Sequence, residues 1–434
     1  MNPSLLQNLL SNLSKCDEMT ELTLDFHHDD QIILPQLWKS FFEKAQSLKS
    51  LTLSRSFNAS LDFSGFQIFP ECFQYMKVLT SLRVHLSISA QLDYDEVFFI
   101  GFLFDSLKSL PQLKKLEFTI DGSYISKDNQ IKRLAEVLEY LTNLHTLDLN
   151  ILHLELSSEA VISLAKNLKN LSCLKRLKLK FTENRNYHLT YSAIQTFAKS
   201  LTHLPLKYFD LDLSDKPMTL SYLIPKRKVP FLSILSSLKD LASLHLDLSA
   251  FPPGKWKRFD LNPKSLRKLT SLSVGIGYFN CTQNYKGLSE FMLCLKVMPS
   301  LTTLKLSGAI VCDQELDLFL KNLDGCPNLH RLELTFQNSG QLSGKPLDSL
   351  QAALVKLTKL EYIEVNLWKS YGYTDNIVSK LLGGLIVLKR LKELVVNFER
   401  TQLLFRIPAF QESVQKLENC KYLTKIEINC VRYL

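Results

Sequence analysis

The stretch LSCLKRLKLKF, residues 171–181, changes its character halfway along. In its second half Leu177, Leu179 and Phe181 alternate with lysine. An apolar period of two is typical of a β-strand that buries one face. A membrane-surface helix would instead need an apolar period near 3.6. The stretch therefore predicts a half-buried strand whose basic side chains point away from the core.

The same pattern recurs along the whole chain of 434 residues as the frame L-x-x-L-x-L-x-L. Fourteen such frames follow one another at spacings of 28 to 35 residues. Of their 56 apolar positions, 54 are occupied by apolar residues, and the exceptions are Arg55 and Gly308. The first frame positions are Met19, Leu48, Leu79, Leu113, Leu144, Leu174, Leu206, Leu241, Leu269, Leu301, Leu329, Leu360, Leu391 and Leu423.

The residues before many frames follow a helical period instead. Ile131, Leu134, Leu138 and Leu141 are three or four residues apart, which is the stripe of an amphipathic helix. Equivalent stripes precede other frames, within 161–171, 194–204 and 347–357. A strand and a helix that alternate about every 31 residues can bury their apolar sides only by stacking on their neighbours.

This frame with its helical stripe resembles the leucine-rich repeat family, in the long, helix-backed form exemplified by ribonuclease inhibitor. The resemblance covers residues 5–430 and implies an α/β solenoid (horseshoe) of about fourteen repeats, with a parallel sheet on the concave face and helices on the convex face. The family's asparagine or cysteine at the ninth frame position is missing here, as at Asp121 and Thr182. We therefore expect turns that are less uniform than those of the family.

We expect residues 1–434 to form a single leucine-rich repeat domain. Residues 1–18 are predicted to be an N-terminal helical half-repeat, and 214–266 hold irregular insertions. One insertion contains Pro225-Lys226-Arg227-Lys228, an exposed basic loop that also looks like a nuclear-import signal. The other is rich in proline and contains Trp256, a candidate partner contact.

The distribution of charge argues against nucleic-acid binding by the concave face. The chain carries a net charge of +9, but frame positions three, five and seven, which face solvent on the sheet, hold eight basic and eleven acidic residues. A nucleic-acid groove would gather the basic surplus instead of excluding it.

One rung of this face is basic and lies between acidic neighbours. Arg176, Lys178 and Lys180 follow Asp148 in the preceding rung and precede Asp210 and Asp212 in the next. Two interpretations remain: a salt-bridge lattice that keeps neighbouring strands from repelling each other, or a charged patch that orients a partner.

Aromatic residues supply the second candidate contact surface. Tyr362 lies in an inner column, and Trp368, Tyr371 and Tyr373 follow it in WKSYGY. A further group lies at 278–285. Such rings either anchor a partner or fill space between irregular repeats, and the sequence favours neither.

Catalytic and cofactor signatures are missing from the sequence. It contains no phosphate-binding loop, dinucleotide fingerprint, nucleophile elbow or zinc-protease motif, so we expect no enzyme activity, cofactor or metal. The run 27–30 (HHDD) is a weak metal candidate, because adjacent loop ligands rarely converge.

The nine cysteines form no paired motif, the N-terminus lacks the basic head of a signal peptide, and no run of apolar residues would span a membrane. We expect a cytoplasmic protein, with nuclear import through the 225–228 loop as the alternative.

The chain stops on its last predicted strand, whose outer edge has no following strand to pair with. Three explanations are open: a partner covers this edge, a second copy covers it, or the strand is frayed. The function predicted from these observations is a non-enzymatic scaffold that binds a protein through the concave face and the insertion loops. The alternatives are a regulator of an enzyme, such as a leucine-rich repeat GTPase-activating protein with Arg83, Arg176 or Arg331 as the acting residue, and a ubiquitin-ligase substrate-recognition subunit.

Overall fold

The computed structural model forms two compact units, residues 1–215 and 216–434. The residues that it describes are 8, 10, 12, 18–26, 35–57, 68–88, 94–122, 128–152, 157–181, 190–214, 238–249, 266–276, 293–308, 313–336, 345–367, 375–397 and 408–429.

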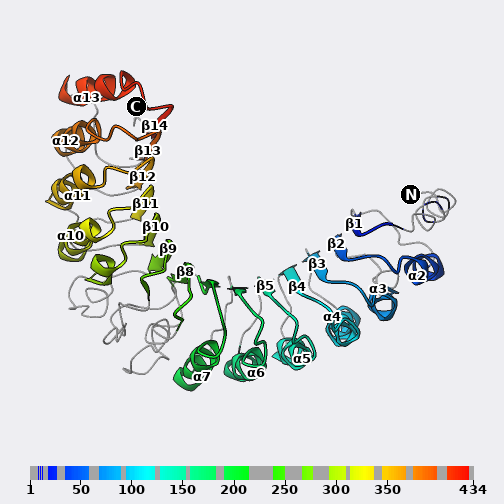
Figure 1. Cartoon of the computed structure of the whole chain (residues 1–434). Coiled ribbons are helices and arrows are strands. Elements are labelled where there is room, and N and C mark those ends of the chain that lie inside the picture. The colour runs from blue at the N-terminus through cyan, green and yellow to red at the C-terminus, as the bar shows by residue number, and fades with distance from the viewer. Residues whose placement is uncertain are drawn as a thin grey trace. The chain divides into compact units, whose positions relative to one another are not determined.

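The first unit alternates strands and helices from its first described strand onward (Figure 1). Its strands are β1 (Glu21–Phe26), β2 (Ser50–Phe57), β3 (Ser81–Ile88), β4 (Lys115–Gly122), β5 (Thr146–Ile151), β6 (Arg176–Lys180) and β7 (Tyr208–Asp212). Its described helices are α2 (Pro35–Lys44), α3 (Ile68–Cys72), α4 (Tyr94–Ser106), α5 (Asp128–Leu138), α6 (Ser158–Leu168) and α7 (Tyr191–Leu201), with 3-10 turns η1 (Phe73–Tyr75) and η2 (Leu107–Ser109).

The second unit repeats this plan. Its strands are β8 (Ser243–Leu248), β9 (Ser271–Ile276), β10 (Thr303–Gly308), β11 (Arg331–Phe336), β12 (Tyr362–Asn366), β13 (Glu393–Asn397) and β14 (Lys425–Asn429). Its described helices are α10 (Asp313–Asn322), α11 (Lys345–Lys356), α12 (Asp375–Leu385) and α13 (Pro408–Glu418), with 3-10 turns η6 (Leu295–Val297) and η7 (Leu323–Gly325).

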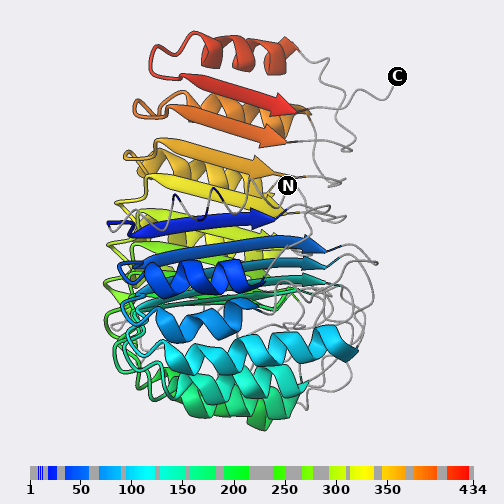
Figure 2. The same cartoon turned by 90° about the vertical axis from the view of Figure 1, so that its right-hand side faces the viewer.

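Within each unit every strand pairs in parallel with its neighbours in sequence. The register matches equivalent frame positions, for example Leu147 with Leu177 and Phe209. Figure 2 shows the strand arrows of each unit pointing the same way, and Figure 1 shows the helices of each unit on one side of its strands. The fourteen strands of the described residues confirm the predicted number of repeats, the parallel sheet and its helical backing.

The core of each unit lies between the sheet and the helices. Leu177 and Leu179 are fully buried and Phe181 is 3% exposed, as the opening stretch predicts. The helical stripe is buried as well, with Ile131 2% exposed and Leu134 fully buried in α5. Removing one such leucine from water contributes roughly 1.5–3 kcal/mol, so each buried frame position is a sizeable contribution to the stability of its repeat.

Helix starts are fixed by local side-chain bonds. The Ser157 hydroxyl accepts a hydrogen bond from the Ala160 N–H at 3.2 Å, and the Thr190 hydroxyl accepts one from the Ala193 N–H at 3.3 Å. These N-caps satisfy amide groups that have no partner inside the helix, and each contributes about 1 kcal/mol. They fix the first turns of α6 and α7.

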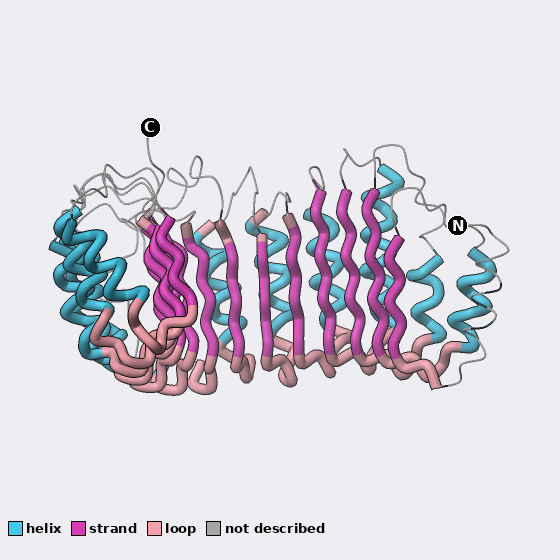
Figure 3. Tube along the Cα trace, turned by 90° about the horizontal axis from the view of Figure 1, so that it is seen from above, coloured by secondary structure: helices cyan, strands magenta, loops and turns pink. Residues whose placement is uncertain are grey.

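The turns that lead from each helix into the next strand form what we call the turn edge, pink along one side of each unit in Figure 3. Here the carbonyl at the second frame position accepts two backbone N–H groups from the next repeat. The Lys114 carbonyl, for instance, accepts from His145 at 2.7 Å and from Thr146 at 3.0 Å, and the Thr302 carbonyl from His330 and Arg331. This backbone ladder joins successive repeats at the start of their strands, at the opposite end from the ninth frame position.

Side chains reinforce the ladder at equivalent places in the two units. The Asn143 amide donates to the Pro111 carbonyl at 2.9 Å, and the Asn328 amide donates to the Pro299 carbonyl at 2.9 Å. These turns are therefore regular. The turns after the strands, where we expected irregularity, lie mostly outside the described residues, so that expectation stays a prediction.

The two exceptions in the frame have different structural roles. Arg55 lies in β2 in register with Phe26 and Leu86 and is only 3% exposed, so a charged side chain occupies a core position. Gly308 ends β10 with φ of 154°, a backbone conformation that other residues rarely adopt. Glycine is required there because of the backbone conformation, and a pattern of apolar positions does not predict such a requirement.

Three predicted features fall partly or wholly outside the described residues. Of the N-terminal half-repeat, residues 8, 10 and 12 are described as helical, and Leu10 is 3% exposed. Of the insertions at 214–266, only Ser214, residues 238–249 and Leu266 are described, so neither the 225–228 loop nor Trp256 is among them.

Candidate functional site

The sheet face that the helices leave uncovered carries the third, fifth and seventh frame positions, and we call it the open face. In β5 buried and partly exposed residues alternate strictly along the strand. The buried set, including Leu147 and Leu149, is held by the core, while Thr146 and Asp148 belong to the open face. Side chains on this face are therefore presented from a rigid base.

The predicted basic rung in the first unit is embedded in acidic neighbours. The Lys178 ammonium donates to the Asp148 carboxylate at 3.0 Å, and the Lys180 ammonium lies 3.5 Å from the Asp212 carboxylate. Asp212 is 9% exposed although it belongs to a sheet face. The structure thus brings together the residues that the sequence placed in adjacent rungs.

Arg176, the third base of this rung, contacts a tyrosine. Its guanidinium lies 3.7 Å from the ring centroid of Tyr208, its register partner in β7. The Tyr208 hydroxyl donates to the Asp210 carboxylate at 3.2 Å, and Asp210 is 5% exposed. Burial, followed by the negative charge of Asp210, raises the pKa of Tyr208. We call Arg176, Tyr208 and Asp210 the first cluster.

The second unit contains the same arrangement. The Arg331 guanidinium lies 3.6 Å from the ring centroid of Tyr362, its register partner in β12. The Tyr362 hydroxyl donates to the Glu364 carboxylate at 2.8 Å. Burial and this hydrogen bond raise the pKa of Tyr362 to about 12. We call Arg331, Tyr362 and Glu364 the second cluster.

A buried carboxylate holds the arginine of the second cluster. Glu333, 8% exposed, accepts from the Arg331 Nε at 2.5 Å and lies 2.9 Å from the Lys305 ammonium. Burial alone would raise the pKa of Glu333, but the hydrogen bonds from Lys305 and Arg331 outweigh it and keep that pKa below its usual value. The pKa of Arg331 is raised in turn, because its bond to Glu333 outweighs the effect of burial.

The two clusters share one sequence pattern. An arginine at the third frame position is followed in the next repeat by a tyrosine at the same position and an acid two residues later. Parallel register brings the arginine and the ring together, and the two-residue step puts the acid on the same face as the hydroxyl. Sequence reasoning selected Tyr362 but missed Tyr208, although the alignment of frames held the signal.

The remaining bases of the open face are also engaged. Of its eight basic side chains, all within the described residues, seven form ion pairs there; they are Arg83, Lys115, Lys178, Lys180, Lys305, Arg331 and Lys425. Glu117 accepts from both Arg83 and Lys115. The salt-bridge lattice, one of the two interpretations of the basic rung, is therefore present.

Much of the positive charge lies at the turn edge instead. Helix C-termini meet there, and their unpaired carbonyls favour cations. Exposed lysines along the turn edge of the first unit are Lys44, Lys49, Lys77, Lys108, Lys114, Lys169, Lys175 and Lys207.

Several predicted site residues lie outside the described part of the chain. These are Trp368, Tyr371, Tyr373 and Trp256, the aromatic group at 278–285 and the HHDD run at 27–30. Within the described ranges no group of three or more histidine, cysteine, aspartate or glutamate side chains could hold a metal ion. In the same ranges no helix combines the length and the apolar character needed to cross a bilayer.

The last described strand is less covered than those before it. The core positions of β14, Ile426 and Ile428, are partly exposed, whereas Leu394 and Val396 of β13 are fully buried. β14 pairs with β13 on one side.

No protein-family model and no curated protein match the sequence. Solved structures do match, at low identity. The TLR13–ssRNA13 complex is 18% identical with a TM-score of 0.37, and the match covers 95% of this chain and 64% of that one. The leucine-rich repeat-containing protein LegL7 from Legionella pneumophila is 12% identical with a TM-score of 0.34, covering 78% and 97%.

The Toll–Spatzle complex of Drosophila is 12% identical with a TM-score of 0.41, and the match covers 98% of this chain and 53% of that one. This chain thus spans less than two thirds of the TLR13 and Toll chains. The buried leucine frame, the parallel register and the helix behind most strands show that the chain has the leucine-rich repeat fold, in its helix-backed form.

Proposed function

We propose that this chain is a non-enzymatic scaffold that binds a protein partner through the open face of its sheets. The observation that carries the proposal is the pair of clusters, in which an arginine stacks on a tyrosine whose hydroxyl is fixed by an acid. Arginine and tyrosine are, together with tryptophan, the residue types that most often dominate protein–protein binding energy.

Pre-organisation supports a binding role. Free arginine and tyrosine side chains lose about 0.5–1.5 kcal/mol each when an interface immobilises them. In the clusters Arg331 is already held by Glu333, and Tyr362 by Glu364. A partner would therefore gain contact with large, flat groups at a reduced entropic cost.

The charge lattice favours a protein over a nucleic acid as the ligand of this face. Binding a phosphate backbone needs cations free to replace counterions. Here seven of the eight bases already face carboxylates, and Lys178 would have to give up its 3.0 Å contact with Asp148. A mixed polar surface with stacked aromatic groups suits a protein epitope better.

The alternative role as a regulator of an enzyme gains no specific support. Arg83 and Arg331 contact Glu117 and Glu333, and Arg176 lies against Tyr208. Each would have to leave its partner to act in trans on a nucleotide.

Affinity capture with quantitative mass spectrometry tests the proposal. The bait is compared with two double variants, Arg176→Ala with Tyr208→Ala and Arg331→Ala with Tyr362→Ala. The control is Lys166→Ala with Lys199→Ala, which changes exposed residues of α6 and α7 on the helical side. We expect a specific protein to be lost from at least one cluster variant and retained by the control.

Photocrosslinking adds a direct measure of contact. A photoreactive residue at Ser273 on the open face should capture the same protein, and one at Lys166 should not. The proposal would be overturned if both cluster variants captured the same proteins as the wild type. Crosslinking to a partner only from Lys166, on the helical side, would also overturn it.

A further inference from the structure

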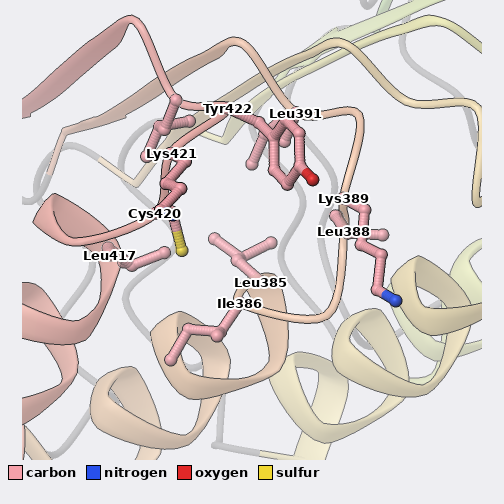
Figure 4. Close-up of a pocket in the computed structure, with 10 residues that line it drawn as sticks. Leu385, Ile386, Leu388, Lys389, Leu391, Leu417, Cys420, Lys421 and Tyr422 are labelled. Atoms are coloured by element: carbon pink, nitrogen blue, oxygen red, sulfur yellow. The ribbon is translucent and has the colours of Figure 1, made fainter.

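A cavity of about 280 Å³ opens at the turn edge of the second unit, between the turns that precede β13 and β14. Its apolar lining comes from Leu385, Ile386, Leu388, Leu391, Leu417 and Leu423. Figure 4 shows Leu385 and Ile386 on one side of the space and Cys420 and Tyr422 on the other. The cavity thus belongs to two successive repeats of one unit and lies away from the open-face clusters.

The size of the cavity suits one large side chain. A cavity of about 150 Å³ can hold benzene, whereas sites for whole small ligands span about 300–1,000 Å³. At about 280 Å³ this cavity is large enough for an indole or phenyl ring.

The surroundings of the cavity continue its apolar surface. Val387 is 54% exposed and Tyr422 is 62% exposed, which is high for large apolar side chains in a folded unit. Both lie in the turns that form the cavity. Tyr422 lines the cavity, and Val387 is the chain neighbour of two lining residues, Ile386 and Leu388. A peptide segment that extends past the cavity can cover both, and this extra area favours a peptide over an isolated small molecule.

The rim is positively charged. The pKa of the Glu361 carboxyl is lowered by Lys392, its hydrogen-bond partner, and to a smaller extent by one of the rim cations, Arg390. Lys389 and Lys421 line the cavity, and Arg390 is adjacent in the same turn as Lys389. Among the described residues, none of these three cations lies within 4 Å of a carboxylate. Other lysines of these repeats are paired, Lys392 with Glu361 at 2.7 Å and Lys416 with Glu412 at 2.5 Å. In Figure 4 the Lys389 ammonium points away from the space, where it can meet a flanking group of a ligand.

We propose that this cavity docks an acidic segment of a protein partner, with one tryptophan, phenylalanine or leucine side chain inserted and flanking carboxylates paired with Lys389, Lys421 and Arg390. The apolar lining of the cavity favours the inserted side chain, and the three cations favour acidic residues next to it. This contact is a second surface, additional to the open face.

A displayed library of random peptides, selected on the full chain, identifies the probe. We expect enrichment of peptides that carry tryptophan, phenylalanine or leucine next to aspartate or glutamate. Binding of a fluorescein-labelled enriched peptide is then measured by anisotropy. Replacing its apolar anchor by serine should weaken binding about tenfold or more, because burial of such a side chain is lost.

Two variants test the cavity and the rim separately. Cys420→Phe places a ring where the Cys420 sulfur faces the space, and Lys389→Glu with Lys421→Glu reverses the rim charge. Each should weaken peptide binding about tenfold or more. The matched control is Lys239→Glu with Lys296→Glu, an equal change of net charge at exposed lysines of other turns in the same unit. Circular dichroism of each variant is recorded to check that it is folded.

Four outcomes would overturn the proposal. The first is that the wild-type chain enriches no peptides relative to the Cys420→Phe protein. The second is that the control variant weakens peptide binding as much as the rim variant, which would indicate that net charge alone determines binding. The third is a concentration-dependent dimer in sedimentation that Cys420→Phe dissociates, which would identify a second copy as the occupant. The fourth is binding to phosphatidylserine vesicles that depends on these residues without peptide enrichment. If the double variant Arg331→Ala with Tyr362→Ala still binds the peptide, the peptide site is distinct from the open face.

Discussion

Glu333→Gln should destabilise the second unit at neutral pH and have little effect in acid. Glu333 is a buried carboxylate with two cationic partners, Lys305 at 2.9 Å and Arg331 at 2.5 Å. The two cations lie on different carboxylate oxygens of Glu333. Glutamine keeps the shape of the side chain but removes its charge, and it replaces one of these oxygens by an NH2 group, which can only donate. The change therefore isolates the electrostatic contribution of one rung.

The magnitude follows from the exposure of the partners. The side chains of Lys305 and Arg331 are 47% and 45% exposed, so solvent screens both pairs. Pairs of this kind contribute roughly 0.2–1 kcal/mol each, so we expect the loss of both pairs to lower the free energy of unfolding at pH 7 by about 0.4–2 kcal/mol. The pKa of Glu333 is lowered in the folded state. Its contribution is thus present above the unfolded pKa and is lost as the pH falls through the folded pKa.

Urea unfolding of wild type and variant at pH 7 and over a series of lower pH values measures this difference and its loss in acid. Hydrogen exchange in β10, β11 and β12 locates it, because neighbouring repeats share the loss. Glu393→Gln is the control: Glu393 lies in β13, has no ion pair among the described residues, and should change stability by less than about 0.5 kcal/mol. The reasoning fails if Glu333→Gln matches this control at pH 7, or if its deficit is the same in acid.

Three further predictions concern the repeats themselves. Leu179→Ala, at a fully buried frame position, should cost about 2–5 kcal/mol in urea unfolding; a loss below 1 kcal/mol would contradict the packing. Gly325→Ala should cost about 1–3 kcal/mol, because a Cβ there would clash with the backbone of Lys296. An unchanged melting temperature would contradict that close approach. Burial, aided by nearby negative charge, raises the pKa of the Cys326 thiol to about 12. Cys326 should therefore resist iodoacetamide at pH 8 while the half-buried Cys173 reacts, which peptide mass spectrometry measures. Equal labelling of the two cysteines would refute this prediction.

The architecture was predictable because it is periodic. Each repeat encodes the same two requirements, a strand with one apolar side and a helix with one apolar stripe, and fourteen copies make the signal redundant. Single failures such as Arg55 and Gly308 do not disturb it. The side of the sheet on which Arg176, Lys178 and Lys180 lie follows from the same alternation.

The partners of these side chains were only partly predictable. Alternation placed Lys178 between Asp148 and Asp210, and the structure pairs its ammonium with Asp148. Alternation could not tell that Arg176 would lie flat on Tyr208. Long side chains choose among several neighbours within reach, and small differences in register and rotamer decide that choice.

By itself the sequence determined the repeat length, the parallel strand order, the buried leucine frame and the identity of the open-face columns, because local hydrophobic periodicity fixes all four. Only the tertiary structure decided which charges neutralise one another, which tyrosines hold arginines, and where the turns before β13 and β14 leave a cavity with a basic rim. These features depend on distances between residues about thirty positions apart, which arise only when successive repeats stack.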